Sequence, residues 1–209
     1  MDFAAARKVM VDSQVRVNDV TDRELHAALG AVERERFCAP DRAHAAYADV
    51  MPEVTAQRRL MLPRDLGKLL QGTDARAGEK ALVIVGPYAA AVLAKMGLDV
   101  TLQDSDAEVF AVTGDALADY GVKTVEAPLN APSGSGYDVI VSEAAVPVRQ
   151  DAWIEALADN GRLVVVERSG PIGKAVLYVK SSEGVSRREL FDGSPVILDE
   201  LKPQPAFAL

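Results

Sequence analysis

The stretch at residues 79–94 constrains the fold more than any other part of the chain. Leu82 to Val85 is a continuous apolar and partly β-branched run, which is typical of a strand covered on both faces in a parallel sheet. Gly86 and Pro87 break this run, and the Ala-rich segment from Tyr88 to Met96 favours a helix. Ligands of open α/β sheets bind at the carboxyl ends of the strands. We therefore look for function at the turn that follows Leu82–Val85.

The rest of the chain predicts alternating strands and helices around this unit. We expect strands at 99–104, 122–125, 137–141 and 163–167, and helices at 105–120 and 153–158. Two more β-rich runs, 175–180 and 185–191, have no helix between them and should pair as an antiparallel hairpin.

This order predicts an α/β fold with a mostly parallel sheet, right-handed crossovers, a C-terminal antiparallel hairpin and N-terminal helices. It is the plan of the S-adenosylmethionine-dependent methyltransferase (Rossmann-like) fold. The alternative is a nicotinamide-binding Rossmann domain. That domain requires G-x-G-x-x-G after the first strand, and the sequence VGPY at 85–88 departs from it.

The N-terminal third is predicted to be helical. We expect residues 1–72 to form an extension that packs on a core at 73–209 as a partial lid near the cleft, within one structural domain overall. Thr21 and Glu24 match a capping box, with Thr21 as the N-cap, and 53–59 is interpreted as a loop.

The first helix raises the question of association. It carries Phe3, Val9, Met10 and Val17, which is more apolar surface than a short isolated helix leaves in water. We expect it to pack on the domain or on a second copy, so the protein is a monomer or a homodimer.

Composition limits the class of partner. The 31 acidic and 23 basic residues give a net charge of -8, which argues against sequence-independent nucleic-acid binding. No run reaches the ~20 apolar residues of a membrane span, and no signal peptide is evident, so we expect a cytoplasmic protein that does not bind membranes. Cys38 is the only cysteine, which excludes an intrachain disulfide. His26 and His44 lack cysteines or acids at metal-ligand spacing, so we expect no metal site.

Several segments together resemble one family, that of the protein-L-isoaspartate O-methyltransferases, in a branch associated with α-proteobacteria. The similar segments are MVDSQVR at 10–16, NDVTD at 18–22, ERERF at 33–37 with Pro40 and Ala46-Tyr47, YAAAVLA at 88–94, YDVI at 137–140, GRLV at 161–164 and PAF at 205–207. Each segment is weakly specific, but their order and spacing match over nearly the whole chain.

The chain departs from this family where the family binds its cofactor. The resemblance implies an acid at the end of the first strand followed by a loop of the form G-x-G-x-G, whose backbone N–H groups approach the cofactor. Here the acid position is Val83, and the loop is shortened to Val85-Gly86-Pro87, in which the proline removes a donor. The family's substrate-side motif, Q-T-I-S, corresponds to residues 58–61, so its serine is Met61. The family's acid after the third strand falls near Pro128.

By resemblance, the candidate cofactor-binding residues are Gly86, Tyr88 and Asp104, and no catalytic residue can be assigned. Asp104 ends the second strand, where the family's acid accepts both ribose hydroxyls of S-adenosylmethionine. The alternatives are a plain turn glycine for Gly86, a packed or half-exposed aromatic ring for Tyr88, and a solvated acid or helix cap for Asp104.

Other polar residues near the same strand ends have plainer interpretations. Glu143 follows the fourth strand, and we expect an exposed loop acid, with a cleft-facing acid as the alternative. Arg58 and Arg59 could bind a carboxylate or phosphate, although paired arginines more often lie on a solvated surface. Cys38 is interpreted as a small core residue.

The resemblance implies methyl transfer from S-adenosylmethionine to an L-isoaspartyl carboxylate of a damaged protein or peptide, as a step of protein repair. The degenerate cofactor motif supports the alternative of a catalytically degenerate methyltransferase-fold scaffold, which binds a partner or self-associates. Because the loop donors are lost, we expect S-adenosylmethionine to bind weakly or not at all.

Overall fold

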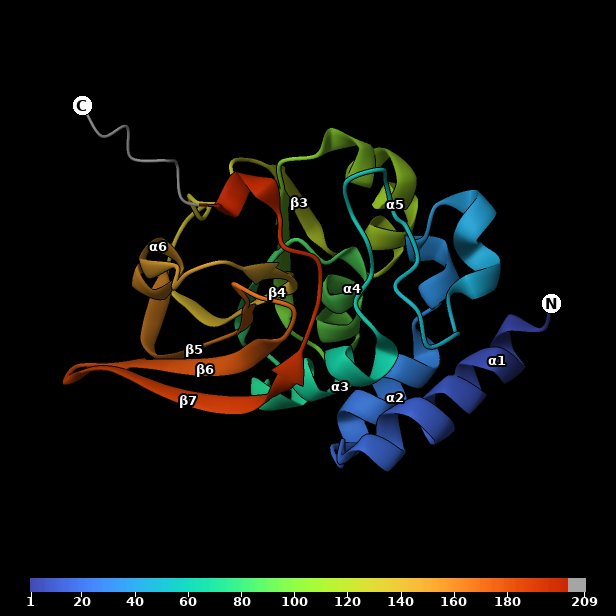
Figure 1. The fold of residues 1–209 in the computed structure, drawn as a ribbon, viewed down its shortest axis with the longest axis horizontal. Coiled ribbons are helices and arrows are strands. Elements are labelled where there is room, and N and C mark those ends of the chain that lie inside the picture. The colour runs from blue at the N-terminus through green and yellow to red at the C-terminus, as the bar shows by residue number, and fades with distance from the viewer. Residues whose placement is uncertain (203–209) are drawn as a thin grey trace.

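The computed structural model describes residues 1–202, as a seven-stranded sheet with helices on both faces (Figure 1). The segment PAF at 205–207 lies outside the described residues. The helices are α1 (Phe3–Met10), α2 (Arg23–Ala31), α3 (Pro63–Gly72), α4 (Pro87–Lys95), α5 (Ala107–Asp119) and α6 (Asp151–Glu155). The strands are β1 (Lys80–Ile84), β2 (Asp99–Asp104), β3 (Lys123–Glu126), β4 (Tyr137–Val146), β5 (Leu157–Glu167), β6 (Gly173–Ser181) and β7 (Gly184–Gly193).

The sheet places β1 at its centre, as the sequence predicts. The strand order is β3-β2-β1-β4-β5-β6-β7, and β1 pairs in parallel with both β2 and β4. The β5–β6 and β6–β7 pairs are antiparallel, so the predicted C-terminal hairpin is confirmed. The carboxyl ends of β1, β2 and β4 therefore meet at one edge of the sheet.

Burial explains the apolar run of β1. Its side chains alternate between two cores, with Ala81 and Val83 on the face covered by α4 and Leu82 and Ile84 on the face covered by α6. A strand buried on both faces needs an apolar residue at every position, which is why residues 81–85 show no polar alternation.

Three local predictions are corrected by the structure. Residues 153–158 are not one helix, because α6 ends at Glu155 and β5 begins at Leu157. The sequence 53–59 is a tight antiparallel hairpin rather than an irregular loop, since Glu53 pairs with Arg59 and the Val54 N–H donates to the Arg58 carbonyl at 2.9 Å.

The third correction concerns the start of α2. Asp22, and not Thr21, is its N-cap, with Oδ1 accepting from the N–H groups of Glu24 and Leu25 at 2.8 and 3.0 Å. The Thr21 N–H instead donates to Gln71 Oε1 at 2.6 Å, which ties this turn to α3.

The first predicted helix is confirmed over residues 3–18, although only Phe3–Met10 is α-helical. It continues from α1 into a π-helical turn at Val11–Val15 and a 3-10 turn at Arg16–Asn18. Met10 is buried within this chain, whereas Val9 and Val17 are exposed. No helix among residues 1–202 is long and apolar enough to cross a membrane.

Candidate functional site

The turn after β1 has an unusual backbone. Val85 has φ 58° and Gly86 has φ 144°, followed at once by Pro87 at the first position of α4. A β-branched residue in the left-handed region is strained, and such outliers persist only where the surroundings hold them in place. Here the Val85 N–H donates to the Gln103 carbonyl on β2, and the Val85 carbonyl accepts from the Glu143 N–H on β4. The turn after β1 is therefore held by backbone hydrogen bonds to both neighbouring strands.

Glu143 fills the space behind this turn. Its side chain extends from β4, Oε1 accepts from the Ala89 N–H at 2.8 Å, and Oε2 accepts from the Met61 N–H at 2.9 Å. Ala89 lies in the first turn of α4, so the carboxylate satisfies one of the free N–H groups at this helix end and lies at the positive end of the helix dipole. Glu143 is only 2% exposed. The prediction of an exposed loop acid is wrong, because the helix end supplies this carboxylate with hydrogen bonds inside the protein.

Gly86 is needed by this internal contact. A Cβ atom at residue 86 would lie 2.7 Å from Glu143 Cγ, which is closer than real contacts allow. The glycine thus makes room for the side chain of the protein's own glutamate.

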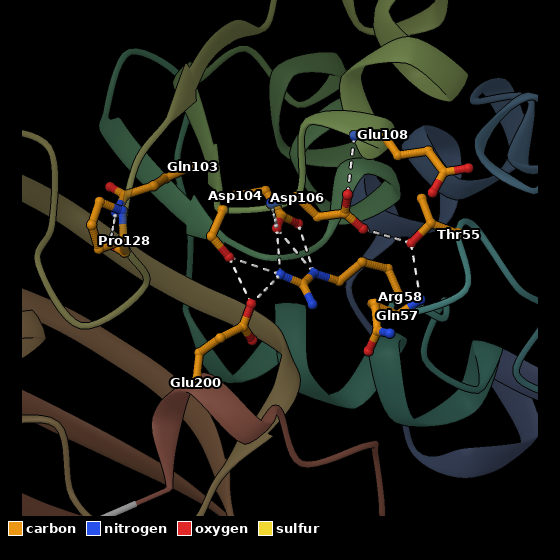
Figure 2. A network of polar contacts seen from close by, with 10 residues as sticks. Thr55, Gln57, Arg58, Gln103, Asp104, Asp106, Glu108, Pro128 and Glu200 are labelled. Carbon is orange, nitrogen blue, oxygen red and sulfur yellow. Dashed lines mark hydrogen bonds and ion pairs between the residues drawn. The ribbon is translucent and has the colours of Figure 1, made fainter. Parts of the chain in front are cut away.

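Asp104 is paired with an arginine from a distant segment (Figure 2). Arg58 Nε donates to Asp104 Oδ1 at 2.9 Å, and Arg58 Nη2 lies 2.8 Å from the same oxygen. The Asp106 N–H donates to this oxygen as well, at 3.0 Å. The side chains of Arg58 and Asp104 are 3% and 0% exposed, so the pair is buried. The alternative of a solvated strand-end acid is thereby excluded for Asp104.

The hairpin at 53–59 positions Arg58. Its turn is fixed by Thr55, whose Oγ1 donates to Asp106 Oδ2 at 2.7 Å in the loop before α5 (Figure 2). The neighbouring Arg59 points the other way and pairs with Glu53 while remaining 40% exposed. The interpretation as a solvated pair holds for Arg59 and is wrong for Arg58.

A third segment closes the same site from the C-terminal side. The 3-10 turn at Asp199–Leu201 brings Glu200 Oε1 to 3.1 Å from Arg58 Nη2 and 2.8 Å from Ser105 Oγ. Arg58 Nη2 also donates to Ser105 Oγ at 2.9 Å. Three segments far apart in the sequence are thus joined through one guanidinium group.

Little space remains at the end of β1. The cavity lined by Arg58, Met61, Val85 and Glu143 has a volume of about 10 Å³. A larger hollow of about 480 Å³ is lined by Ser105, Glu200 and residues 126–130 at the end of β3.

Burial governs the electrostatics of both acids. Burial raises the pKa of Glu143, and Arg34 with the Met61 and Ala89 N–H groups opposes this by favouring the carboxylate. Burial likewise raises the pKa of Asp104, against the opposing effect of the Arg58 guanidinium.

Tyr88, the third predicted site residue, is fully buried on the side of α4 that faces the N-terminal segment. Its ring packs 5.8 Å from the ring of Phe37, and the Arg34 guanidinium lies 4.7 Å from its centroid. Arg34 is itself fully buried and donates to the carbonyls of Ala46 and Met61 at 2.7 and 2.6 Å. Tyr88 therefore contributes to the core beneath the turn.

The remaining polar candidates have structural roles. Cys38 is buried, as expected, and burial raises the pKa of its thiol to about 11. His26 Nε2 lies 2.8 Å from the Val20 carbonyl, and His44 is exposed. Within residues 1–202 no cluster of three or more histidine, cysteine or acidic side chains is arranged to hold a metal ion.

Of the residues in this site, sequence reasoning placed Gly86 and Asp104 correctly at the carboxyl ends of neighbouring strands. It missed that Arg58 and Glu143 turn inward to meet these ends. One signal could have pointed to them. Residues 83–87 carry no polar side chain that could cap the first turn of α4, so the free N–H groups of this helix end are available to a carboxylate from a neighbouring strand.

Comparison with known proteins identifies the family. The family model for "Protein-L-isoaspartate(D-aspartate) O-methyltransferase (PCMT)" matches residues 6–189. A protein-L-isoaspartate O-methyltransferase of Methylorubrum populi is 30% identical over 198 residues, covering 92% of each chain. One of Gloeobacter violaceus is 28% identical, covering 93% of this chain and 99% of the relative.

Solved structures agree on the fold. A Plasmodium falciparum protein described as a protein-L-isoaspartate O-methyltransferase, in complex with S-adenosyl-L-homocysteine, superposes with a TM-score of 0.79 at 14% identity, covering 93% of this chain and 98% of that one. The predicted S-adenosylmethionine-dependent methyltransferase fold is confirmed. From the match over residues 6–189, this chain belongs to the protein-L-isoaspartate(D-aspartate) O-methyltransferase family.

Proposed function

We propose that this protein is a family member whose cofactor cleft is filled by its own side chains, so that it acts by binding rather than by methyl transfer. The observation that carries the proposal is the buried pair of Arg58 and Asp104, with Glu143 hydrogen-bonded to the first turn of α4. These are the two positions at which the family resemblance places the ribose and the methionine end of S-adenosylmethionine.

The residues present do not fit that cofactor. Both hydroxyls of a ribose would need the oxygens of Asp104, yet Oδ1 already accepts from Arg58 and from the Asp106 N–H. A methionine carboxylate at the start of α4 would compete with Glu143, whose Oε1 already accepts from the Ala89 N–H, and the cavity there has a volume of about 10 Å³. Val83, at the position of the family's acid, has no carboxylate, and Pro87 has no backbone N–H to donate.

The energetic consequence follows from the buried pair. A cofactor that engages Asp104 must first separate it from Arg58, and breaking a buried ion pair costs about 3–5 kcal/mol. At about 1.4 kcal/mol per decade, this lowers affinity by roughly two to three and a half orders of magnitude. We therefore propose that S-adenosylmethionine binds weakly or not at all.

The second candidate is the reaction named for the relatives. In that case the protein methylates an isoaspartyl carboxylate of a damaged protein or peptide, using S-adenosylmethionine. Two observations favour it: the match to the family over residues 6–189, and the hollow of about 480 Å³ beside Ser105. It requires Arg58 to withdraw from Asp104, and therefore also to break its contact with Glu200.

A methylation assay distinguishes the two candidates. Purified protein is incubated with an isoaspartyl peptide and labelled S-adenosylmethionine, with the Methylorubrum populi relative as the positive control. We expect turnover at or near background for this protein. Turnover comparable with the relative's, and lost in a folded Asp104→Asn variant, would establish methyl transfer and reject the binding role.

A further inference from the structure

A second candidate site lies at the opposite end of the sheet from the filled cleft, where β1 begins. It is a groove of about 570 Å³ between the C-terminal end of α3 and the face of the β6–β7 hairpin. None of the residues that line it belongs to the site around Asp104. Figure 1 shows β6 and β7 as a long ribbon, with α3 beside it and no element beyond β7.

The floor of the groove is apolar and only partly covered. Leu177 and Val179 project from β6 on the side away from Val176 and Tyr178, which are buried against α6. From β7, Leu190 and Phe191 reach the same face, because the strand has an irregularity where Val176 pairs with Glu189 and Ala175 with Phe191. All four floor side chains, Leu177, Val179, Leu190 and Phe191, are only partly buried.

The rim carries two cations that form no salt bridge within residues 1–202, although Asp65 on α3 lies close enough to interact electrostatically with Lys68. Lys68 lies on α3, with Nζ 5.8 Å from the Phe191 ring centroid, and Arg188 lies on β7 opposite Leu177. A third cation, Arg162, is already neutralised by Glu79 at 2.7 Å. The acids on the rim are Asp74, which pairs with Arg76, and Asp19 at the far end. This leaves a local excess of positive charge on a chain whose net charge is -8.

The groove borders an open strand edge. β7 is the last strand of the sheet, pairs only with β6, and is exposed from Gly184 to Glu189. An edge strand presents unpaired N–H and C=O groups that can accept another strand. If a segment is added there, every second side chain falls on the groove face.

We propose that the β7 edge and this groove together bind an extended segment of a partner protein. Every second side chain of this segment lies on the groove face, and these side chains are apolar except for one acidic residue. The backbone of the segment extends the sheet beside residues 184–189. Its apolar side chains cover the floor, and its carboxylate lies between Lys68 and Arg188. The site is independent of whether the cofactor cleft at Asp104 functions.

The test uses the full-length protein and a fluorescent peptide, acetyl-Thr-Val-Thr-Glu-Thr-Leu-Thr-Val-amide, titrated by anisotropy. Two control peptides replace Glu with Lys, or carry N-methyl groups on alternate amides. We expect saturable binding of the Glu peptide, about tenfold weaker binding of the Lys peptide because two surface ion pairs are lost, and none of the N-methylated peptide. Backbone amide shifts in NMR spectra should concentrate on residues 184–189.

Protein variants locate the site. The double variant Lys68→Glu/Arg188→Glu should weaken binding of the Glu peptide by at least about tenfold and reverse the preference toward the Lys peptide. The matched control is Arg23→Glu, an exposed arginine at the start of α2, which should leave affinity unchanged. Absence of binding, or binding that the double variant does not alter, would overturn the proposal. A dimer in light scattering that the double variant dissociates would also overturn it, because a second copy would then cover this face.

Discussion

Replacing Arg58 with alanine tests the central contact of the filled cleft. The variant leaves Asp104 buried at 0% exposure without its cation, and Ser105 and Glu200 lose their shared donor. Removing one partner of a buried ion pair costs about 3–5 kcal/mol, mostly because the remaining charge stays buried and unpaired. We expect Arg58→Ala to lower the free energy of unfolding by that amount.

Arg59 provides a matched control at the next position. It is 40% exposed and pairs with the partly exposed Glu53, so Arg59→Ala should cost no more than about 1 kcal/mol. The assay is urea denaturation of both variants. Their denaturation midpoints are compared after confirming that the dependence of the unfolding free energy on urea concentration is unchanged. For a chain of this size, 3–5 kcal/mol corresponds to a fall of roughly 6–20 °C in Tm.

A double-mutant cycle isolates the pair itself. Asp104→Asn removes the charge that Arg58 neutralises. The double variant Arg58→Ala/Asp104→Asn should therefore lose less free energy of unfolding than the sum of the losses in the two single variants. If Arg58→Ala and Arg59→Ala have equal costs, or if the cycle is additive, the pair is not buried as described and the reasoning fails.

Three further outcomes are expected elsewhere in the chain. Burial raises the pKa of Glu143 above 4.5, so the stability that its protonated form contributes is complete below pH 4.5 and is lost as the pH rises through the folded-state pKa. Urea denaturation of Glu143→Gln, measured from below pH 4.5 upward, should lack this loss of stability. The same pH dependence in the wild type and in Glu143→Gln would contradict the prediction. Gly86→Ala should cost about 1–3 kcal/mol, because its Cβ meets Glu143 at a positive φ, whereas Gly114→Ala in open space on α5 should be neutral or stabilising; equal costs in thermal melts would refute the close contact. Cys38, buried and with a thiol pKa raised to about 11, should resist a thiol reagent at pH 8 until the protein is unfolded in urea; rapid labelling of the native protein would show that it is accessible.

The sheet could be predicted from the sequence because its signals are local. The apolar run at Leu82–Val85 and the polar turn between β6 and β7 each carry their meaning within a few residues. The errors arose where a distant partner decides the local structure. Thr21 matches a capping box, yet its N–H is bound by Gln71 and Asp22 takes the capping role.

The candidate site shows the same difference between residues with local signals and residues placed by a distant partner. Sequence reasoning could locate Asp104, because it ends a recognisable strand. It could not find that Arg58 turns inward while the adjacent Arg59 stays in solvent, since that choice depends on an acid 46 positions away. The sequence predicts that Glu143 is a loop acid because the predicted strand ends at residue 141, whereas β4 continues to Val146.

The proposed preference for binding over methyl transfer depends most directly on whether the cleft accepts the cofactor's product. The decisive measurement is titration calorimetry with S-adenosylhomocysteine on the wild-type protein, Arg58→Ala and Asp104→Asn, each first shown to be folded. With Arg58 on Asp104 and Glu143 against α4, we predict no saturable heat at micromolar ligand for the wild type. We predict none for Arg58→Ala either, because Glu143 still occupies the start of α4. Low-micromolar affinity in the wild type, abolished by Asp104→Asn, would contradict the account and make this protein a cofactor-binding methyltransferase.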